Sequence, residues 1–118
     1  EYPSIAGVYL NRLRQGIRLQ ADPTVAFCYD FTLNRILFKH LEYDSPYNTY
    51  LHEGLPPGPI CVPDKASLEA VLNPDRHGYL FFCASAAMDG THKFAVTLSE
   101  HNRNAREFQR ALDARRPR

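Results

Sequence analysis

Apolar residues recur every three or four positions in several stretches of the chain, which is the spacing of one helix face. The pattern predicts five helices, over residues 4–14, 23–29, 32–41 and 66–72 and from residue 98 onward. Ser4 suits the N-cap of the first helix, and Gly16 suits its end. Thr97 and Glu100 have the spacing of a capping box that opens the last helix. The apolar stripe of that helix, expected to face the core, consists of Leu98, His101, Ala105, Phe108 and Leu112.

Residues 79–84 are aromatic-rich and apolar on both faces, which favours a strand. Residues 92–96 are the expected antiparallel partner, because residues 88–91 supply turn chemistry between the two segments. Residues 42–63, in contrast, contain several of the nine prolines and have little periodicity. A loop of that length is uncommon in a compact domain unless it is functional. The sequence therefore predicts one α+β domain over residues 1–118, mostly helical, with one small antiparallel β-hairpin.

Composition and charge exclude several classes of protein. The 118 residues are enough for one modest core, and the net charge of +1 does not call for a nucleic acid or an anionic membrane surface. No stretch approaches the roughly 20 apolar residues that cross a bilayer. Because the chain opens at Glu1 without an initiator Met, we expect a fragment of a longer protein. Cys28, Cys61 and Cys83 show no metal-ligand spacing, and three buried thiols are favoured over one disulfide and a free thiol.

Three groups of polar residues are candidates for chemistry. His101 lies in the apolar stripe beside Asn102, where a hydrogen-bonded core histidine is favoured over a polar group at the floor of a cleft. Asp22 suits an N-cap, and the alternative is a carboxylate that faces a ligand together with Gln20. The segment 47–50 places two tyrosines around an amide and a hydroxyl, a set that suits a sugar. A loop whose tyrosines cover the core remains an equal alternative there.

Signals for cofactors and metals are weak. No Gly-rich phosphate loop occurs, and neither Lys39, Lys65 nor Lys93 has the surroundings of a Schiff-base lysine. His40 and Asp44 are one helical turn apart, but no third ligand follows at a useful spacing. We therefore expect neither a cofactor nor a metal.

Several longer motifs occur together and in order along nearly the whole chain. In this combination the chain resembles the YceG-like family, the endolytic murein transglycosylases known as MltG. The motifs are Tyr9-Leu10-Asn11-Arg12-Leu13, Leu19-Gln20-Ala21-Asp22-Pro23-Thr24, Asp44-Ser45-Pro46-Tyr47-Asn48-Thr49-Tyr50, Gly54-Leu55-Pro56-Pro57-Gly58-Pro59-Ile60, Leu72-Asn73-Pro74, Tyr79-Leu80-Phe81 and His101-Asn102. The segments around residues 41–46 and 101–104 resemble members from Bacteroides-type bacteria.

The resemblance implies a peptidoglycan lytic transglycosylase, a lyase with a lysozyme-like cleft. Such an enzyme cuts nascent glycan strands between MurNAc and GlcNAc and leaves 1,6-anhydroMurNAc ends. It also implies a single N-terminal anchor in the bacterial inner membrane, a LysM-like subdomain, and a catalytic domain on the periplasmic face. Peptidoglycan strands are then the expected partner, together with proteins of cell-wall synthesis.

The family's catalytic glutamate belongs to a Glu-Lys-Glu-Thr-like motif upstream of the position matched by Glu1. We therefore name no catalytic residue in this chain and expect the isolated chain to have little or no activity. The resemblance implies substrate-binding roles for Gln20, Asp22, Thr24, Tyr47, Asn48, Thr49, Tyr50, His101 and Asn102. Two alternatives remain: a non-catalytic peptidoglycan-binding module, and a pyridoxal-phosphate-dependent aminodeoxychorismate lyase, a label that family members have carried.

Overall fold

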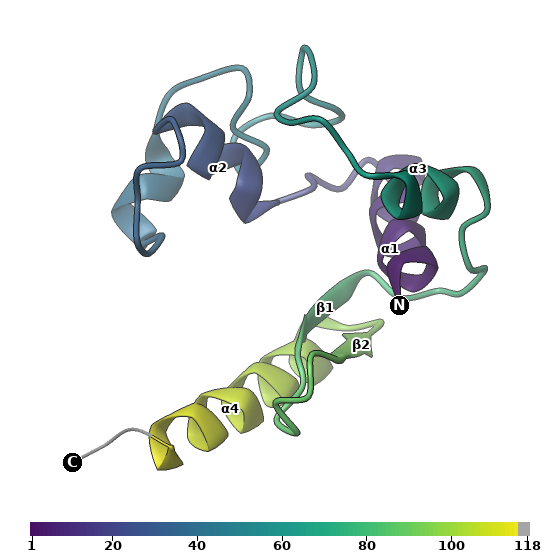
Figure 1. Cartoon of the computed structure of the whole chain (residues 1–118), viewed down its shortest axis with the longest axis vertical. Helices are drawn as coiled ribbons and strands as arrows, with labels where there is room; N and C mark the ends of the chain where they lie inside the picture. The colour runs from purple at the N-terminus through teal and green to yellow at the C-terminus, as the bar shows by residue number, and fades with distance from the viewer. Residues whose placement is uncertain (116–118) are drawn as a thin grey trace. The chain divides into compact units, whose positions relative to one another are not determined.

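The computed structural model describes residues 1–115, and the chain divides into two compact units (Figure 1). The first unit contains Glu1–Asn11 and Lys65–Arg118, and the second contains Arg12–Asp64. Each unit is described by itself below. Helices and one two-stranded sheet make up the regular structure, so the α+β prediction is confirmed. The lysozyme-like cleft stays a prediction.

Helix α1 spans Tyr2–Arg14 and begins two residues before the predicted start. Ser4 is therefore not its N-cap, and its hydroxyl instead donates a hydrogen bond to Asp75 at 2.6 Å. Gly16 does terminate the helix: its φ of +68° lies in the left-handed region that favours glycine. The backbone N–H of Ile17 then returns to the carbonyl of Arg12 at 2.9 Å, which satisfies one of the last helical acceptors.

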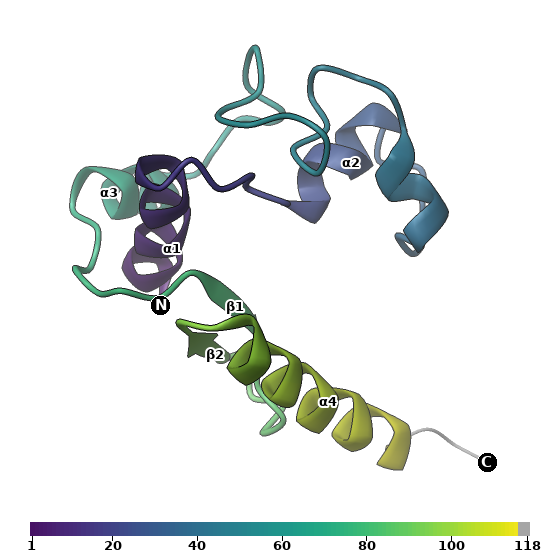
Figure 2. The ribbon, with the colours of Figure 1, turned by 180° about the vertical axis from the view of Figure 1, so that it is seen from behind.

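The connection over residues 73–80, which we call the strap, is bound tightly to α1 (Figure 2). The amide nitrogen of Asn11 donates to the carbonyls of His77 and Tyr79, at 2.8 and 3.0 Å. The approach depends on Gly7, where an added Cβ would lie 2.6 Å from both the carbonyl oxygen of Asp75 and the ring of His77. Glycine is therefore required at position 7 by close packing.

The predicted hairpin is confirmed with slightly shorter strands. Strand β1 spans Phe81–Ala84 and pairs antiparallel with β2, His92–Ala95, so that Phe82 lies opposite Phe94. Between the strands Gly90 has a φ of +85°, as the expected turn requires. The helix α3 spans Lys65–Leu72 and also matches its prediction closely.

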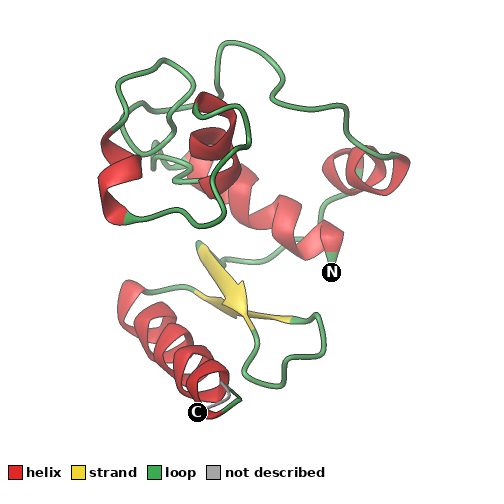
Figure 3. Cartoon of the chain, turned by 60° about the vertical axis from the view of Figure 1, so that its left-hand side comes forward, coloured by secondary structure: helices red, strands yellow, loops and turns green. Residues whose placement is uncertain are grey.

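Helix α4 spans Leu98–Ala114 and packs against the hairpin (Figure 3). The hydroxyl of Thr97 accepts a hydrogen bond from the backbone N–H of Glu100 at 3.2 Å, so the predicted helix start is confirmed. His101 stacks on Phe81 with ring centroids 5.1 Å apart. Leu98, however, is 59% exposed, so the predicted core stripe is wrong at its first position.

The prediction of a helix over residues 32–41 is wrong. The second unit contains α2 over Asp22–Cys28, as expected, but only a short 3-10 helix η1 over Phe38–Glu42. Side chains here bond to the backbone and compete with helical hydrogen bonding. The Thr32 hydroxyl donates to the carbonyl of Tyr29 at 2.6 Å, and the ring of His40 accepts from the N–H of Leu37 at 2.8 Å.

Residues 43–64 contain neither helix nor strand, as predicted for the proline-rich loop. The cores of both units are small, and buried apolar side chains within residues 1–115 are Ala6, Val8, Leu19, Val25, Ala70 and Ala95. The expectation of three buried thiols is wrong, because Cys61 is exposed while Cys28 and Cys83 are half-buried. All three thiols are free. No helix within the described part of the chain is long and apolar enough to cross a membrane.

Candidate functional site

The second unit brings most of the predicted site residues together, where the extended segment before α2 meets the loop at residues 47–50. The backbone N–H of Gln20 donates to the carbonyl of Thr49 at 3.2 Å. The phenol of Tyr50 donates a short hydrogen bond to the carboxylate of Asp22. Residues that are 28 positions apart in the chain are therefore direct neighbours.

Thr24 and Thr49 connect the two segments through their hydroxyl groups, whose oxygens are 2.8 Å apart. The Thr24 hydroxyl donates to the carbonyl of Ala21 at 2.6 Å, and the Thr49 oxygen accepts from the N–H of Ala21 at 2.9 Å. Since the Thr24 proton is already used, Thr49 must donate to Thr24. Both side chains are buried, so their polar groups serve the fold and position the neighbouring residues.

Asn48 is fully buried and organises the loop from inside. Its amide nitrogen donates to the carbonyls of Leu41 and Tyr43, at 2.9 Å each, and its amide oxygen accepts from the N–H of Tyr50 at 2.9 Å. These bonds use both of its donors and one acceptor position. The predicted contact between Asn48 and substrate stays a prediction, but its burial fits the positioning of Tyr50 better.

Asp22 and Gln20 are the exposed polar members of the cluster. Asp22 is the first residue of α2, whose N-cap is Ala21, so the interpretation of Asp22 as an N-cap is wrong. Its carboxylate accepts from Tyr50 instead. Gln20 has a φ of +49°, which is uncommon for a residue other than glycine and is typical of sites where structure is constrained by function. Tyr50 is half-buried, so Gln20 and Asp22 are the most exposed polar side chains of this cluster.

The remaining predicted residues are Tyr47, in the same loop, and His101 and Asn102, in the first unit. Tyr47 packs its ring against Phe27, with centroids 4.7 Å apart, so part of the ring covers the interior as the structural alternative required. His101 and Asn102 belong to the first unit, on α4. His101 is half-buried on Phe81, whereas Asn102 is exposed. Their roles at a substrate site stay predictions.

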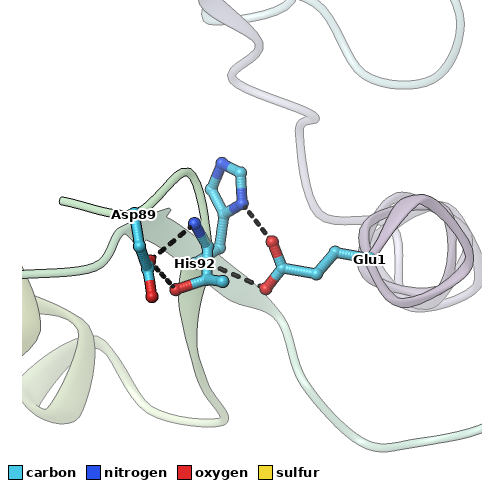
Figure 4. Close-up of polar contacts among 4 residues, drawn as sticks. Glu1, Asp89 and His92 are labelled. Carbon is cyan, nitrogen blue, oxygen red and sulfur yellow. Dashed lines mark hydrogen bonds and ion pairs between the residues drawn. The ribbon is translucent and has the colours of Figure 1, made fainter. Parts of the chain in front are cut away.

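Two ionised carboxyls in the first unit were not anticipated (Figure 4). The carboxylate of Glu1 accepts from the ring Nδ1 and from the backbone N–H of His92, at 2.9 Å each. These hydrogen bonds lower the pKa of Glu1 below its ordinary value. The hydroxyl and backbone N–H of Thr91 likewise lower the pKa of Asp89. A general acid needs a raised pKa, so neither the Glu1 nor the Asp89 carboxyl suits that role.

The spacing of Asp89 and Thr91 is that of an Asx-turn, a signal that sequence inspection could have found. The contact between Glu1 and His92 spans 91 positions and has no local signal. Within residues 1–115, no three His, Cys, Asp or Glu side chains are grouped so that they could hold a metal ion. Burial raises the pKa of the Cys83 thiol, with a smaller contribution from the charge of Glu107, which disfavours a thiolate nucleophile.

Comparisons with known proteins give one consistent family. The model of the YceG-like family matches residues 1–107. The endolytic murein transglycosylase of Bacillus subtilis strain 168 is 45% identical over 104 residues, which are 88% of this chain and 28% of that protein. The protein of the same name from Streptococcus pneumoniae strain D39 is 31% identical over 108 residues, 87% of this chain and 19% of that protein.

A solved structure agrees with these matches. The crystal structure of a YceG-like protein from Listeria monocytogenes superposes with a TM-score of 0.78 and 44% sequence identity. The superposition covers 86% of this chain and 32% of that one. The chain therefore spans between about a fifth and a third of the length of these relatives.

Proposed function

The chain belongs to the YceG-like family, and on that premise we propose that it forms part of the catalytic domain of an endolytic murein transglycosylase. The observation that carries the proposal is the hydrogen bond from half-buried Tyr50 to exposed Asp22, two positions after the exposed Gln20. Carboxylate, phenol and amide groups are suited to the hydroxyl and acetamide groups of a murein strand. The buried contact between Thr24 and Thr49 joins the two segments that carry these residues.

The reaction proposed for the full-length parent needs one acid/base group. That group protonates the glycosidic oxygen between MurNAc and GlcNAc, and the bond from this oxygen to C1 of MurNAc breaks. The same group, now a carboxylate, takes the proton of the C6 hydroxyl of MurNAc, whose oxygen bonds to C1. The products are a 1,6-anhydroMurNAc end and a free GlcNAc hydroxyl, without water, and the acid/base group regains its proton. A raised pKa favours the first step.

We propose that this group is a glutamate upstream of Glu1 in the parent. The lowered pKa of Glu1 supports the distinction, because a carboxyl held ionised by His92 is a poor proton donor. Asp22 is accordingly assigned to binding: its carboxylate accepts from Tyr50 and offers further lone pairs to sugar hydroxyls. We assign Gln20 to the same subsite and leave Thr24, Asn48 and Thr49 with positioning roles.

We propose further that the parent acts at the periplasmic face of the inner membrane, through an anchor outside this chain. Support comes from the name of the relatives, since murein lies outside that membrane. Contacts with cell-wall synthesis proteins are part of the same proposal.

The test uses the full-length parent and its Asp22→Asn and Tyr50→Phe variants, incubated with murein strands. Mass spectrometry then measures the anhydro-muropeptides. A hydrogen bond to a charged group is worth about 1.5–3 kcal/mol, so each variant should lower the rate by about tenfold or more. The double variant should lose little beyond the single ones, because the two side chains act as one unit. Glu53→Gln, an exposed loop change, is the control and should retain full activity.

A glycan-binding module without catalysis is the second candidate. It is favoured by the pKa displacements of Glu1 and Asp89, which are both downward. A parent that binds murein strands but releases no anhydro ends would establish this candidate and reject the transglycosylase. Abundant anhydro product from the isolated chain would instead reject our placement of the acid outside it.

A further inference from the structure

A second group of aromatic residues lies in the second unit, outside the cluster of Asp22 and Tyr50. Tyr29 follows the end of α2, His40 lies on η1, and Tyr43 comes directly after η1. The ring of Tyr29 is packed edge-to-face with both others, with centroid distances of 5.2 Å to His40 and 4.9 Å to Tyr43. Tyr43 is 42% exposed. We call these three residues the aromatic triplet.

Within residues 1–115 the fold uses only one polar side-chain atom of the aromatic triplet, the Nδ1 atom of His40. Nδ1 of His40 accepts from the N–H of Leu37 at 2.8 Å, so the proton of the neutral ring is on Nε2. Within residues 1–115 neither this Nε2–H nor the hydroxyls of Tyr29 and Tyr43 have a hydrogen-bond partner. One defined donor and two hydroxyl groups therefore accompany the aromatic rings.

The backbone beside the aromatic triplet is strained. Asp30 and Phe31 both have positive φ, +55° and +56°, although neither is glycine. Such conformations cost about 1 kcal/mol or more each and persist where the surroundings impose them. The positive φ values accompany the end of α2, where the N–H groups of Asp30 and Phe31 donate to the carbonyls of Phe27 and Ala26, at 3.0 and 2.8 Å. The ring of Phe31 packs edge-to-face on Phe27, with centroids 6.2 Å apart, yet Phe31 is 56% exposed and Phe38 on η1 is 91% exposed. The segments that carry the aromatic triplet therefore also expose apolar surface.

The aromatic triplet is continuous with the loop of the proposed site. The buried amide of Asn48, which holds Tyr50, also donates to the backbone carbonyl of Tyr43 at 2.9 Å. One side chain therefore fixes the positions of both Tyr43 and Tyr50. A polymer bound at Tyr50 and Asp22 is a ligand long enough to engage both places.

We propose that the aromatic triplet is an additional contact site for the same N-acetylated glycan strand. The rings of Tyr29 and Tyr43 pack against the CH faces of a sugar, and the Nε2–H of His40 donates to a sugar hydroxyl or acetamide oxygen. The proposal rests on the proposed function for its ligand. It adds Tyr29, His40 and Tyr43, to which the resemblance assigned no role, and it extends the bound length of strand.

The test maps binding of soluble, peptide-free strands of alternating GlcNAc and MurNAc to the chain. Backbone amide shifts of residues 29, 40 and 43 should move during the titration together with those of residues 22 and 50. Tyr43→Leu should weaken binding about three- to tenfold, the contribution of one aromatic contact. Tyr2→Leu, in the first unit and 49% exposed, is the matched control and should bind as the unmodified chain does.

Several outcomes distinguish the proposals. Shifts confined to residues 22 and 50, or an unchanged affinity of Tyr43→Leu, would overturn the inference and leave the proposed function intact. If Tyr43→Leu does not fold, two measurements still test the inference. Tyr43→Phe keeps the aromatic ring, and the amide shifts of the unmodified chain need no variant. Unchanged strand affinity of Tyr43→Leu in the full-length parent would mean that another part of the parent covers the aromatic triplet, which also overturns the inference.

Discussion

Thr49 donates its hydroxyl to the hydroxyl of Thr24 across 2.8 Å, and this buried bond joins two segments that are 25 residues apart. The same Thr49 oxygen accepts from the N–H of Ala21. The Thr49 hydroxyl therefore links the start of α2 to the loop at residues 47–50, together with the backbone bond from Gln20 to Thr49 and the bond from Tyr50 to Asp22.

Thr49→Val removes this hydroxyl while keeping the shape of the side chain. The N–H of Ala21 then loses its acceptor in a buried environment, which costs about 1–3 kcal/mol. Urea denaturation should show that loss in the free energy of unfolding. Thr49→Ser keeps the hydroxyl and should lose clearly less. Equal losses in the two variants would mean that the methyl group, and not the hydrogen bond, matters here.

Gly7→Ala tests the contact between the strap and α1. The added Cβ would lie 2.6 Å from backbone as well as side-chain atoms, so either the strap or the helix must move. Overpacking of this kind costs about 1–3 kcal/mol, and the thermal midpoint should fall accordingly. Gly78→Ala in the same strap is the control, because its Cβ meets no atom within 4 Å. A Gly7→Ala protein as stable as Gly78→Ala would contradict the packing described.

Glu1 predicts a specific dependence of stability on pH. Its pKa is lowered in the folded chain by the hydrogen bonds from His92, so the folded state favours the ionised carboxylate. The stabilisation is complete above the ordinary pKa of 4.5 and is lost as the pH falls through the lowered value. Glu1→Gln should flatten the stability profile in that acidic range and leave its shape near neutrality unchanged. Glu53→Gln should not alter the profile, and a flattening there would point to general charge effects.

Asn11→Asp exchanges a donor for an acceptor at a buried position. Asn11 is 8% exposed, and its amide nitrogen donates to the carbonyls of His77 and Tyr79. A carboxylate in its place would face two carbonyl oxygens and lose both bonds, so we expect a loss of about 3 kcal/mol or more. Amide hydrogen exchange should quicken along the strap first. Asn34→Asp, at an exposed position, should leave exchange in the strap unaltered.

Local signals account for the elements that were predicted well. Thr97 and Glu100 define the start of α4, Gly16 defines the end of α1, and Gly90 lies in the hairpin turn. Each of these signals acts between residues only a few positions apart, so a single sequence contains all of the relevant information. The hairpin is a similar case, because its two strands are joined by one short turn.

The wrong helix over residues 32–41 had the right apolar spacing but no buried surface to use it. No residue from 32 to 41 is fully buried: Leu33, Ile36 and Leu41 are half-buried, and Leu37 is 44% exposed. Hydrogen bonds from Thr32 and to His40 favour turns instead, and apolar spacing alone does not reveal this competition.

The sequence predicted which residues belong to the candidate site, but not how they contact one another. Family motifs identified Asp22, Thr49 and Tyr50, yet only the structure shows that Thr49 is buried and that Tyr50 reaches Asp22. Pairing across 28 positions depends on how the loop folds back, which has no short-range signal. The contact of Glu1 with His92 was missed for the same reason.

The enclosed carboxamide of Asn48 has a practical consequence for mutational screens. Alanine at this position would release the carbonyls of Leu41 and Tyr43 and the N–H of Tyr50 at once. A screen for lost function would score Asn48 as strongly as a residue that binds a ligand, although the Asn48 side chain is fully buried. If the positions found in such a screen are ranked by the exposure of their side chains, the buried residues that hold this loop are separated from the exposed ones that can bind a ligand.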